Sequence, residues 1–360
     1  MGDLPYPNNQ AKTGSRKGNR LTMNDVAALA KVSPSTVSLF LRNPSAVSAK
    51  RAERIQATIN ETGYSINRLA GALAGAHNRA VGVIVPSLIN AFFSETLQAM
   101  QEVFESCGYQ LLISNSDYDT QREIELLRTH LSWSPAALVL TGYPHPDARP
   151  MLAEAGIPVA QMWELGGQPF HLQVGFFHEE VGAALAEHLY AQGYRTFTYI
   201  GSRMKVDLRA KKRADGFCAW LKEKGQEPNI IDLVDRTTAI AMAQVFEQLQ
   251  LTENIPHALC FSNDVLAISA LFETHRLGIN VPNQIGIAGF GDLPLSQFSF
   301  PSLTTVKPYP QDIGRIVATR LITWIETGTL PTEPETIDLG FELIGRESTA
   351  LNLTSQAPST

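Results

Sequence analysis

Residues 21–75 read LTMNDVAALAKVSPSTVSLFLRNPSAVSAKRAERIQATINETGYSINRLAGALAG, and this stretch decides how the chain begins to fold. Thr22 is expected to cap a first helix, and Asp25 follows three residues later as the acidic half of a capping box. After a tight turn, Ser33 is expected to cap a second helix that starts at Pro34, where a missing N–H costs nothing. The pattern therefore predicts two short helices joined by a turn.

A third helix completes a small bundle. Ser48 precedes this helix, Ile55 and Ile59 lie on its apolar face, and Gly63 ends it. Two short helices braced by a third describe a helix-turn-helix, whose second helix lies in the major groove of DNA. The residues expected to be exposed on that helix are Ser33, Ser35, Thr36 and Ser38. A helical bundle without a ligand is the alternative.

The order of these residues resembles the headpiece of the LacI/GalR family of bacterial repressors. The matching positions are D25-V-A-x-x-A-x-V-S-x-x-T-V-S, then V47-S before a basic helix, then G63-Y-x-x-N67-R. In that family a hinge helix orders on operator DNA and inserts a leucine into the minor groove, and Leu73 stands at this position. The resemblance implies DNA contacts by Thr22, Ser33, Pro34, Ser35, Thr36, Ser38, Arg42, Ser48, Lys50, Asn67, Arg68 and Leu73, with Lys31 and Arg51 as further phosphate contacts.

Departures from the family pattern leave the operator sequence open. Leu39 stands where the family usually has an arginine that reads guanine, and Ile66 replaces the usual proline before the hinge. Gly71 lowers the helix propensity of the hinge by about 1 kcal/mol relative to alanine.

The charges of the chain are unevenly distributed. Residues 1–78 hold ten Lys/Arg and four Asp/Glu, whereas the remaining residues hold 19 and 31. A basic head on an acidic body favours a polyanion such as DNA as partner at one end, although composition alone also allows chance. The sequence contains no run of about 18 apolar residues, so no membrane span is expected. The N-terminus lacks the apolar core of a secretory signal, and three scattered cysteines fit a reducing cytoplasm, so a cytoplasmic protein without cofactor or metal is expected.

Beyond Arg79, apolar runs alternate with helical segments. This alternation is the signature of parallel sheets covered by helices on both faces. Strands are expected at 80–86, 109–114, 137–142, 157–162, 197–201, 258–262, 285–291 and 336–344, and residues 303–308 lead into the last helix. Helices are expected at 93–107, 120–131, up to Gly156, 209–225, 264–277 and 310–328, and residues 164–171 look like a crossover.

Two α/β lobes in succession resemble the periplasmic-binding-protein-like core of the same family. The motifs N90-x-F-F, L189-x-x-x-G-Y-R, S262-N-D, GFG and L303-T-T-V occur in the family's order. The fold class is therefore expected to be an all-α helix-turn-helix headpiece plus a two-lobed α/β core. The expected parts are a disordered arm (1–20), a headpiece (21–65), a hinge (66–78), a first lobe (79–163 and 292–325), a second lobe (164–291 and 326–348) and a tail (349–360).

Ligands of open α/β sheets bind beyond the carboxyl ends of the strands, so residues that follow strands are the candidates for a cleft between the lobes. The candidates are Asn90, Phe92, Phe93, Tyr143, Trp163, Arg209, Arg213, Asn263 and Asp292. Arg213 and Asn263 match effector contacts of the family. Phe92, Phe93 and Trp163 can equally pack in the core, and Asp264 can either cap the following helix or touch ligand.

The candidate cleft favours an anion. Many family members have Asp-Asn where this chain has Phe177-His178, and an aspartate where this chain has Gly291. These acids usually hold sugar hydroxyls, whereas paired arginines can grip a carboxylate. The stretches F40-L-R-N-P44, L131-S-W-S, V174-G-F, F261-S-N-D and I337-D-L-G-F most resemble the gluconate-type branch of the family. A sugar acid such as gluconate or a keto-gluconate is the first expectation, a phosphorylated sugar the second and a neutral hexose a poorer one.

The function expected from these features is a sequence-specific repressor controlled by a small effector. Its partners are a pseudo-palindromic operator and a second copy of the chain, with a tetramer also open. The sequence has no GxGxxG after a strand, P-loop, GxSxG or metal-spaced His/Cys set, which disfavours an enzyme. A secreted sugar-binding protein would not need the basic headpiece. Induction and co-repression both remain open, with induction favoured for a catabolic branch.

Overall fold

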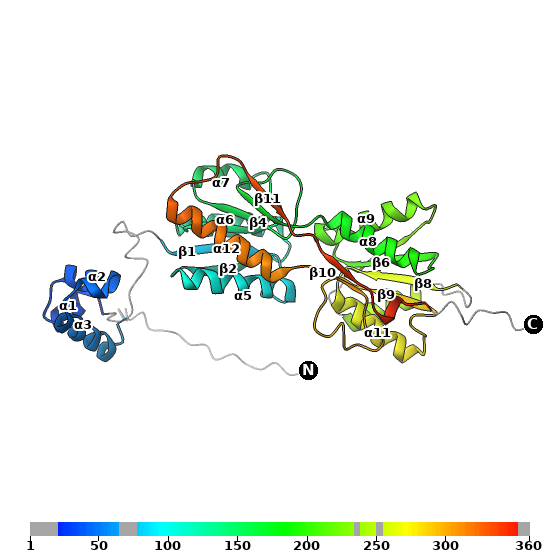
Figure 1. The fold of residues 1–360 in the computed structure, drawn as a ribbon, viewed down its shortest axis with the longest axis horizontal. Helices are drawn as coiled ribbons and strands as arrows, with labels where there is room; N and C mark the ends of the chain where they lie inside the picture. The colour runs from blue at the N-terminus through cyan, green and yellow to red at the C-terminus, as the bar shows by residue number, and fades with distance from the viewer. Residues whose placement is uncertain (1–20, 65–77, 234–237, 250–254, 352–360) are drawn as a thin grey trace, which may run out of the picture. The chain divides into compact units, whose positions relative to one another are not determined.

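The computed structural model describes residues 21–64, 78–233, 238–249 and 255–351. Its contacts divide the chain into two units, residues 1–77 and 78–360, and each is described by itself (Figure 1). The expected hinge helix falls on residues 65–77, outside the described residues.

The headpiece contains three helices and one short 3-10 turn. They are α1 (Met23–Leu29), α2 (Pro34–Arg42), η1 (Pro44–Ala46) and α3 (Ala49–Thr62). Thr22 and Asp25 form the predicted capping box, and the Ser33 hydroxyl accepts from the backbone N–H of Thr36 at 3.2 Å. Gly63 ends α3 in a left-handed conformation. The helix-turn-helix expected from the sequence is confirmed. Its small core is Val26, Ala27, Ala30, Val37, Phe40, Val47 and Ile55.

The first lobe of the larger unit is built on a six-stranded parallel sheet of order β11-β5-β4-β3-β1-β2. The strands are β1 (Ala80–Val85), β2 (Gln110–Asn115), β3 (Ala137–Thr141), β4 (Val159–Met162), β5 (Leu172–Gly175) and β11 (Glu335–Asp338). The helices are α5 (Ala91–Ser106), α6 (Thr120–Ser132), α7 (Ala148–Ala155) and α12 (Pro310–Thr327). Val83 packs with α5 and α12, and the next residue, Ile84, packs with α6 and α7 on the other face.

The second lobe contains a four-stranded parallel sheet of order β7-β6-β8-β9. The strands are β6 (Thr196–Ser202), β7 (Asn229–Leu233), β8 (His257–Phe261) and β9 (Ile285–Ala288). The helices are α8 (His178–Ala191), α9 (Leu208–Glu223), α10 (Thr238–Gln248) and α11 (Asp264–Leu277). Cys260 lies on the face covered by α8 and α9, whereas Leu259 and Phe261 face α10 and α11. Both sheets confirm the expected α/β core (Figure 1).

The boundary between the lobes differs from the expected one. Strand β5, at 172–175, pairs with β4, so the first lobe continues beyond residue 163. The single strand expected at 336–344 is two strands in different places: β11 joins the first sheet, and β12 (Glu342–Ile344) pairs antiparallel with β10 (Thr305–Lys307). Among the described residues, the chain therefore crosses between the lobes three times, near residues 176, 308 and 340.

The described residues lack two features, a membrane-spanning helix and a cluster of metal-ligating side chains. No helix among them is long and apolar enough to cross a bilayer. In the same residues, no three or more His, Cys, Asp or Glu side chains gather closely enough to hold a metal ion.

Candidate functional site

A cavity of about 300 Å³ lies between the two lobes. This volume is at the lower end of the range of ligand pockets, roughly 300–1,000 Å³. The first lobe contributes Ser87, Ile89, Asn90, Ala91, Phe92, Phe93, Tyr118 and Trp163. The second lobe and its connection contribute His178, Ser202, Arg203, Asp207, Arg209, Arg213, Ser262, Asn263, Val265, Leu266, Phe290 and Leu293. The sequence-predicted residues Asn90, Phe92, Phe93, Trp163, Arg209, Arg213 and Asn263 are thus brought together.

Aromatic rings form the wall supplied by the first lobe. The ring centroid of Trp163 lies 6.0 Å from that of Phe92 and 5.6 Å from that of Phe93. All three side chains are buried, and all three line the cavity, so the alternatives of core and cleft are both realised. Asn90 starts α5, where its side-chain oxygen accepts from the backbone N–H of Phe92 at 3.1 Å. This cap fixes where the helix that carries Phe92 and Phe93 begins.

Arg213 is a buried cation that has no acidic partner in the described part of the chain. Its side chain is 5% exposed and lies on α9, with the guanidinium carbon 4.2 Å from the ring centroid of Phe290. One terminal nitrogen donates to the Ser262 carbonyl at 3.0 Å, and the other lies 3.0 Å from His178 Nδ1. No carboxylate among the described residues forms an ion pair with it, and its Nε–H has no hydrogen-bond partner there. Because a buried charge is costly without a counter-charge, this arginine favours an anionic ligand.

His178 joins this arginine to the aromatic wall. Its Nε2 lies 3.0 Å from the carbonyl oxygen of Trp163, which can only accept, so Nε2 carries the proton. Its Nδ1 must then accept from Arg213, which can only donate. Burial, reinforced by the charges of Arg213 and Arg209, holds the pKa of His178 well below its ordinary value. The imidazole is therefore neutral.

Arg209 lies one helical turn before Arg213 on α9. Its terminal nitrogens are 4.0 Å from a Glu164 oxygen and 3.9 Å from an Asp207 oxygen, beyond hydrogen-bond distance. Glu164 instead makes its short contact, 2.8 Å, with Lys212. Arg209 thus retains donors for a ligand, while nearby acids partly balance its charge.

Two sequence-predicted residues lie outside the cavity lining. Tyr143 is displaced toward the crossover, where Lys212 Nζ lies 5.4 Å from its ring centroid. Asp292 is engaged by Arg346, whose terminal nitrogen lies 2.6 Å from its carboxylate. Both follow strands as expected, but each contacts a neighbouring cationic side chain, and neither lines the cavity.

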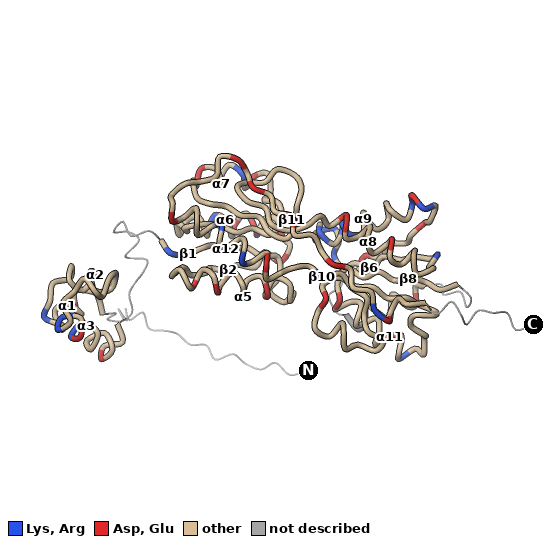
Figure 2. The backbone as a smooth tube through the Cα atoms, in the orientation of Figure 1, with Lys and Arg blue, Asp and Glu red and all other residues tan. Residues whose placement is uncertain are grey.

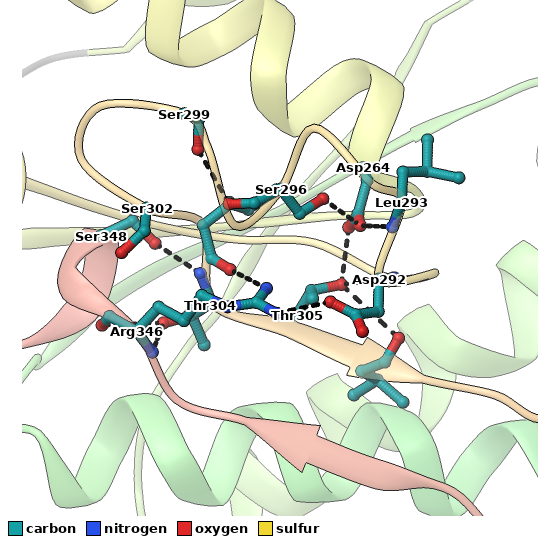
Figure 3. Close-up of polar contacts among 12 residues, drawn as sticks. Asp264, Asp292, Leu293, Ser296, Ser299, Ser302, Thr304, Thr305, Arg346 and Ser348 are labelled. Atoms are coloured by element: carbon teal, nitrogen blue, oxygen red, sulfur yellow. Dashed lines mark hydrogen bonds and ion pairs between the residues drawn. The ribbon is translucent and has the colours of Figure 1, made fainter.

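Asp264 neither caps α11 nor lines the cavity. The cap is Asn263, whose side-chain oxygen accepts from Leu266 N–H at 3.0 Å. The buried Asp264 carboxylate accepts from Leu293 N–H at 3.0 Å and from the hydroxyls of Ser296 and Thr305, each at 2.6 Å (Figure 3). Burial raises its pKa, which these hydrogen bonds oppose. Asp264 therefore anchors the segment that carries Leu293 into the cavity wall.

Sequence reasoning missed Tyr118, Arg203 and the role of His178. Tyr118 and Arg203 both have left-handed backbone, with φ of 62° and 56°, and no sequence pattern marks such positions. Arg203 reaches from the second lobe to Asp117 in the first, with 3.6 Å between their charged atoms. Burial raises the pKa of Tyr118 to about 12, so its hydroxyl stays protonated.

The second candidate site is the helix-turn-helix. Thr22, Ser33, Pro34, Ser35, Ser48 and Lys50 are exposed, and Thr36 and Ser38 are half-buried. The Ser33 hydroxyl lies 2.7 Å from that of Ser35 and 2.8 Å from that of Thr36, so the start of α2 presents a cluster of hydroxyls. The described headpiece, residues 21–64, has five Lys/Arg and three Asp/Glu (Figure 2). Asn67, Arg68, Leu73 and the side chain of Arg42 lie outside what the structure describes.

Comparison with known proteins matches both parts of the chain. Residues 22–67 match the model of bacterial regulatory proteins of the lacI family, and residues 186–349 match the periplasmic binding protein-like domain. The HTH-type transcriptional regulator GntR of Pseudomonas aeruginosa is 37% identical over 93% of this chain and 97% of that protein. The GntR protein of Escherichia coli is 32% identical over 91% of this chain and 98% of that protein.

Solved structures agree with the fold. A LacI-family transcriptional regulator from Silicibacter pomeroyi is 32% identical, with a TM-score of 0.82 over 91% of this chain and 99% of that one. The lac repressor dimer bound to operator and the anti-inducer ONPF has a TM-score of 0.74 over 91% of this chain and 99% of that one. Its identity is 23%, so that likeness concerns the fold alone.

Proposed function

The chain belongs to the lacI family of bacterial transcriptional regulators, and from this premise we propose that it is a repressor whose affinity for operator DNA is set by a sugar acid bound between its lobes. The family makes it a DNA-binding regulator with a sugar-binding domain rather than an enzyme. The effector is a sugar acid, cavity residues bind it, and its binding changes the affinity for operator DNA.

The observation that carries the effector class is the unpaired charge of Arg213. Three arginines line the cavity, Arg203, Arg209 and Arg213, and Asp207 is the one acidic residue among its described lining. A carboxylate can pair with a guanidinium through two parallel hydrogen bonds, while aromatic rings cover the apolar face of a sugar chain. Gluconate or a keto-gluconate is the first choice, and the matches to the two GntR proteins support this branch. A phosphorylated sugar is the alternative, because phosphate uses the same donors.

The DNA-binding part acts as a homodimer on a pseudo-palindromic operator. One recognition helix reads one half-site, so two-fold symmetry of the protein implies two-fold symmetry of the DNA. Large apolar side chains support self-association of the core: Leu295, Phe298 and Phe300 are 66%, 77% and 92% exposed. Such exposed groups are typical of protein contacts. Operator affinity falls steeply with salt, because phosphate contacts by residues such as Lys50 and Arg51 release counterions.

Effector and operator are coupled through the arrangement of the lobes. An effector that contacts Trp163 on one lobe and Arg213 on the other stabilises the closed arrangement. Coupling between two sites is reciprocal, so effector and operator change each other's affinity by the same factor, typically about 5–150-fold. We expect the effector to lower the affinity for the operator, so that it acts as an inducer.

A thermal-shift screen of the full chain tests the effector class. The ligands are gluconate, keto-gluconates, other aldonates, sugar phosphates and neutral hexoses. A bound ligand raises the melting temperature by mass action, so sugar acids are expected to raise it most. Operator titration with and without the best ligand then gives the coupling factor. Stabilisation by a neutral hexose alone, with no anion active, would overturn the sugar-acid assignment.

A further inference from the structure

The side chain of His178 lies between the two residues that carry unsatisfied donors in the cavity wall. Trp163 Nε1 and Arg213 Nε are buried and have no hydrogen-bond partner among the described residues. His178 contacts both residues, with 3.0 Å to the Trp163 carbonyl and 3.0 Å to an Arg213 terminal nitrogen. These two residues come from different lobes, so one imidazole links the lobes beside both donors.

We propose that His178 is the positioning residue that makes the cavity selective for anions: it holds the Arg213 guanidinium by accepting a hydrogen bond without supplying a negative charge. The charge of Arg213 is therefore left for the ligand. The inference rests on the function proposed above, since it concerns the same cavity, and it names the residue that decides between charged and neutral ligands.

The protonation of His178 is fixed by its partners. The Trp163 carbonyl requires a proton on Nε2, and the Arg213 guanidinium requires a lone pair on Nδ1. A second proton would place an imidazolium directly against Arg213, with Arg209 and Lys212 adding further positive charge. His178 is also the first residue of α8, where the N-terminal end of the helix disfavours a cation. All of these surroundings keep the ring neutral.

The backbone of Trp163 is part of the same arrangement. Trp163 has a left-handed backbone with φ of 76°, an unfavourable conformation for a large side chain. Its N–H donates to the Val174 carbonyl at 2.8 Å, and its carbonyl accepts from His178. The two bonds fix the backbone of Trp163, whose ring packs 5.6 Å from that of Phe93 and lines the cavity. A carboxylate at residue 178 would instead bind Arg213 as an internal counter-ion and compete with any anionic ligand.

Two isosteric substitutions in the full chain separate charge from shape. In His178→Asn the amide oxygen replaces Nδ1 as a neutral acceptor, whereas His178→Asp puts a carboxylate in the same place. Calorimetric titration with gluconate is expected to give His178→Asn an affinity within about tenfold of the wild type, and His178→Asp a loss of about 100-fold or more. The neutral polyol of the same carbon chain should bind the two variants equally. If the role of His178 were purely structural, both variants would bind both gluconate and the polyol more weakly, and by similar factors.

Operator binding and the melting temperature serve as controls for folding. If the two variants bind gluconate with equal affinity while the wild type binds it well, the role of His178 is overturned and the proposed function is not. A wild type that binds no sugar acid and no sugar phosphate would overturn the proposed function. If His178→Asp does not fold, nitrogen NMR of the wild-type histidines tests the proposal. It requires that the His178 ring is neutral from pH 5 to 8 and carries its single proton on Nε2. A ring that titrates in this range, or that carries its proton on Nδ1, contradicts it.

Discussion

The two walls of the cavity are chemically different. The first lobe supplies aromatic rings from Phe92, Phe93 and Trp163, and the second supplies the guanidinium groups of Arg209 and Arg213. A ring covers apolar surface without demanding a charge, whereas a guanidinium demands an acceptor. The proposed sugar acid carries C–H groups that a ring can cover and a carboxylate that a guanidinium can bind, so it would use both walls. The division explains how binding can report on the distance between the lobes, since both sets of contacts form only when the lobes are close.

The largest expected effect is on the cationic wall. Arg213→Ala removes the one lining cation that no described carboxylate balances, so the affinity for the sugar acid should fall by about 100-fold or more. The thermal shift with ligand should disappear, while operator affinity without ligand stays unchanged because residue 213 lies outside the headpiece unit. Calorimetry and operator titration measure the two quantities.

Lys211→Ala is the matched control for Arg213→Ala. Lys211 lies on the same helix and pairs with Asp215 on its exposed side, so its removal changes the net charge equally without touching the cavity. An equal loss of affinity in both variants would mean that general charge, and not a contact with Arg213, attracts the ligand.

Acid should destabilise the cores of both lobes. Each lobe buries a histidine against a hydroxyl: His130 is 2.9 Å from Ser114 in the first, and His257 is 2.8 Å from Thr198 in the second. Burial lowers the pKa of both, and that of His257 to about 4. The unfolded chain then binds the proton first, so stability is full above about pH 6.5 and is lost as the pH falls toward 4.

His257→Gln is predicted to flatten this loss, because glutamine keeps a neutral partner for Thr198 and does not titrate. Between pH 7 and pH 5, His257 accounts for a loss of about 2 kcal/mol in the free energy of unfolding. Urea unfolding at pH 7 and pH 5 measures the difference, and the wild type should lose more stability than the variant. Parallel pH dependence of the two proteins would show that His257 takes up its proton as readily when folded as when unfolded.

Local signals made much of this molecule predictable from sequence. Thr22, Ser33 and Gly63 act within three or four residues of themselves, and the three helix ends that they mark are where the pattern placed them. Apolar runs likewise predicted the central strands of both sheets, because a strand buried on both faces has no polar alternation.

Contacts between distant residues were not predictable. His178 meets Arg213 across 35 residues, and Asp292 meets Arg346 across 54, so the expectation that Asp292 faces ligand missed a competing cation. The separation of β11 from β12 depends on which sheet each strand joins, and nothing local records that choice. Position after a strand therefore identifies candidates for a cleft, but pairing decides which of them stay available.

A smaller effect is expected from the aromatic wall. Trp163→Phe keeps a ring against Phe93 but removes the indole N–H, a buried donor without a described partner. If the sugar acid accepts from this N–H, its affinity should fall by about 2–12-fold, the usual value of one hydrogen bond. Trp133→Phe, at a position 43% exposed and outside the cavity, is the control. Unchanged affinity in Trp163→Phe would show that the wall acts only through its ring surface.

The smallest effect is expected from the ion pair between Arg203 in the second lobe and Asp117 in the first. This side chain lies 3.6 Å from the carboxylate of Asp117 in the other lobe and 5.7 Å from the ring centroid of Tyr118. The two charged side chains are 28% and 42% exposed, so water screens the pair, and such pairs contribute about 0.2–1 kcal/mol. Arg203→Ala should therefore reduce sugar-acid affinity by only about 1.4–5-fold, through a less favourable closed arrangement. Higher salt should shrink the difference between variant and wild type, because an exposed ion pair is screened. Arg276→Ala, which breaks an exposed ion pair within α11, gives the baseline for removing one surface charge. A loss as large as that of Arg213→Ala would mean that Arg203 binds the ligand itself, and the cationic wall would then extend to the edge of the cavity.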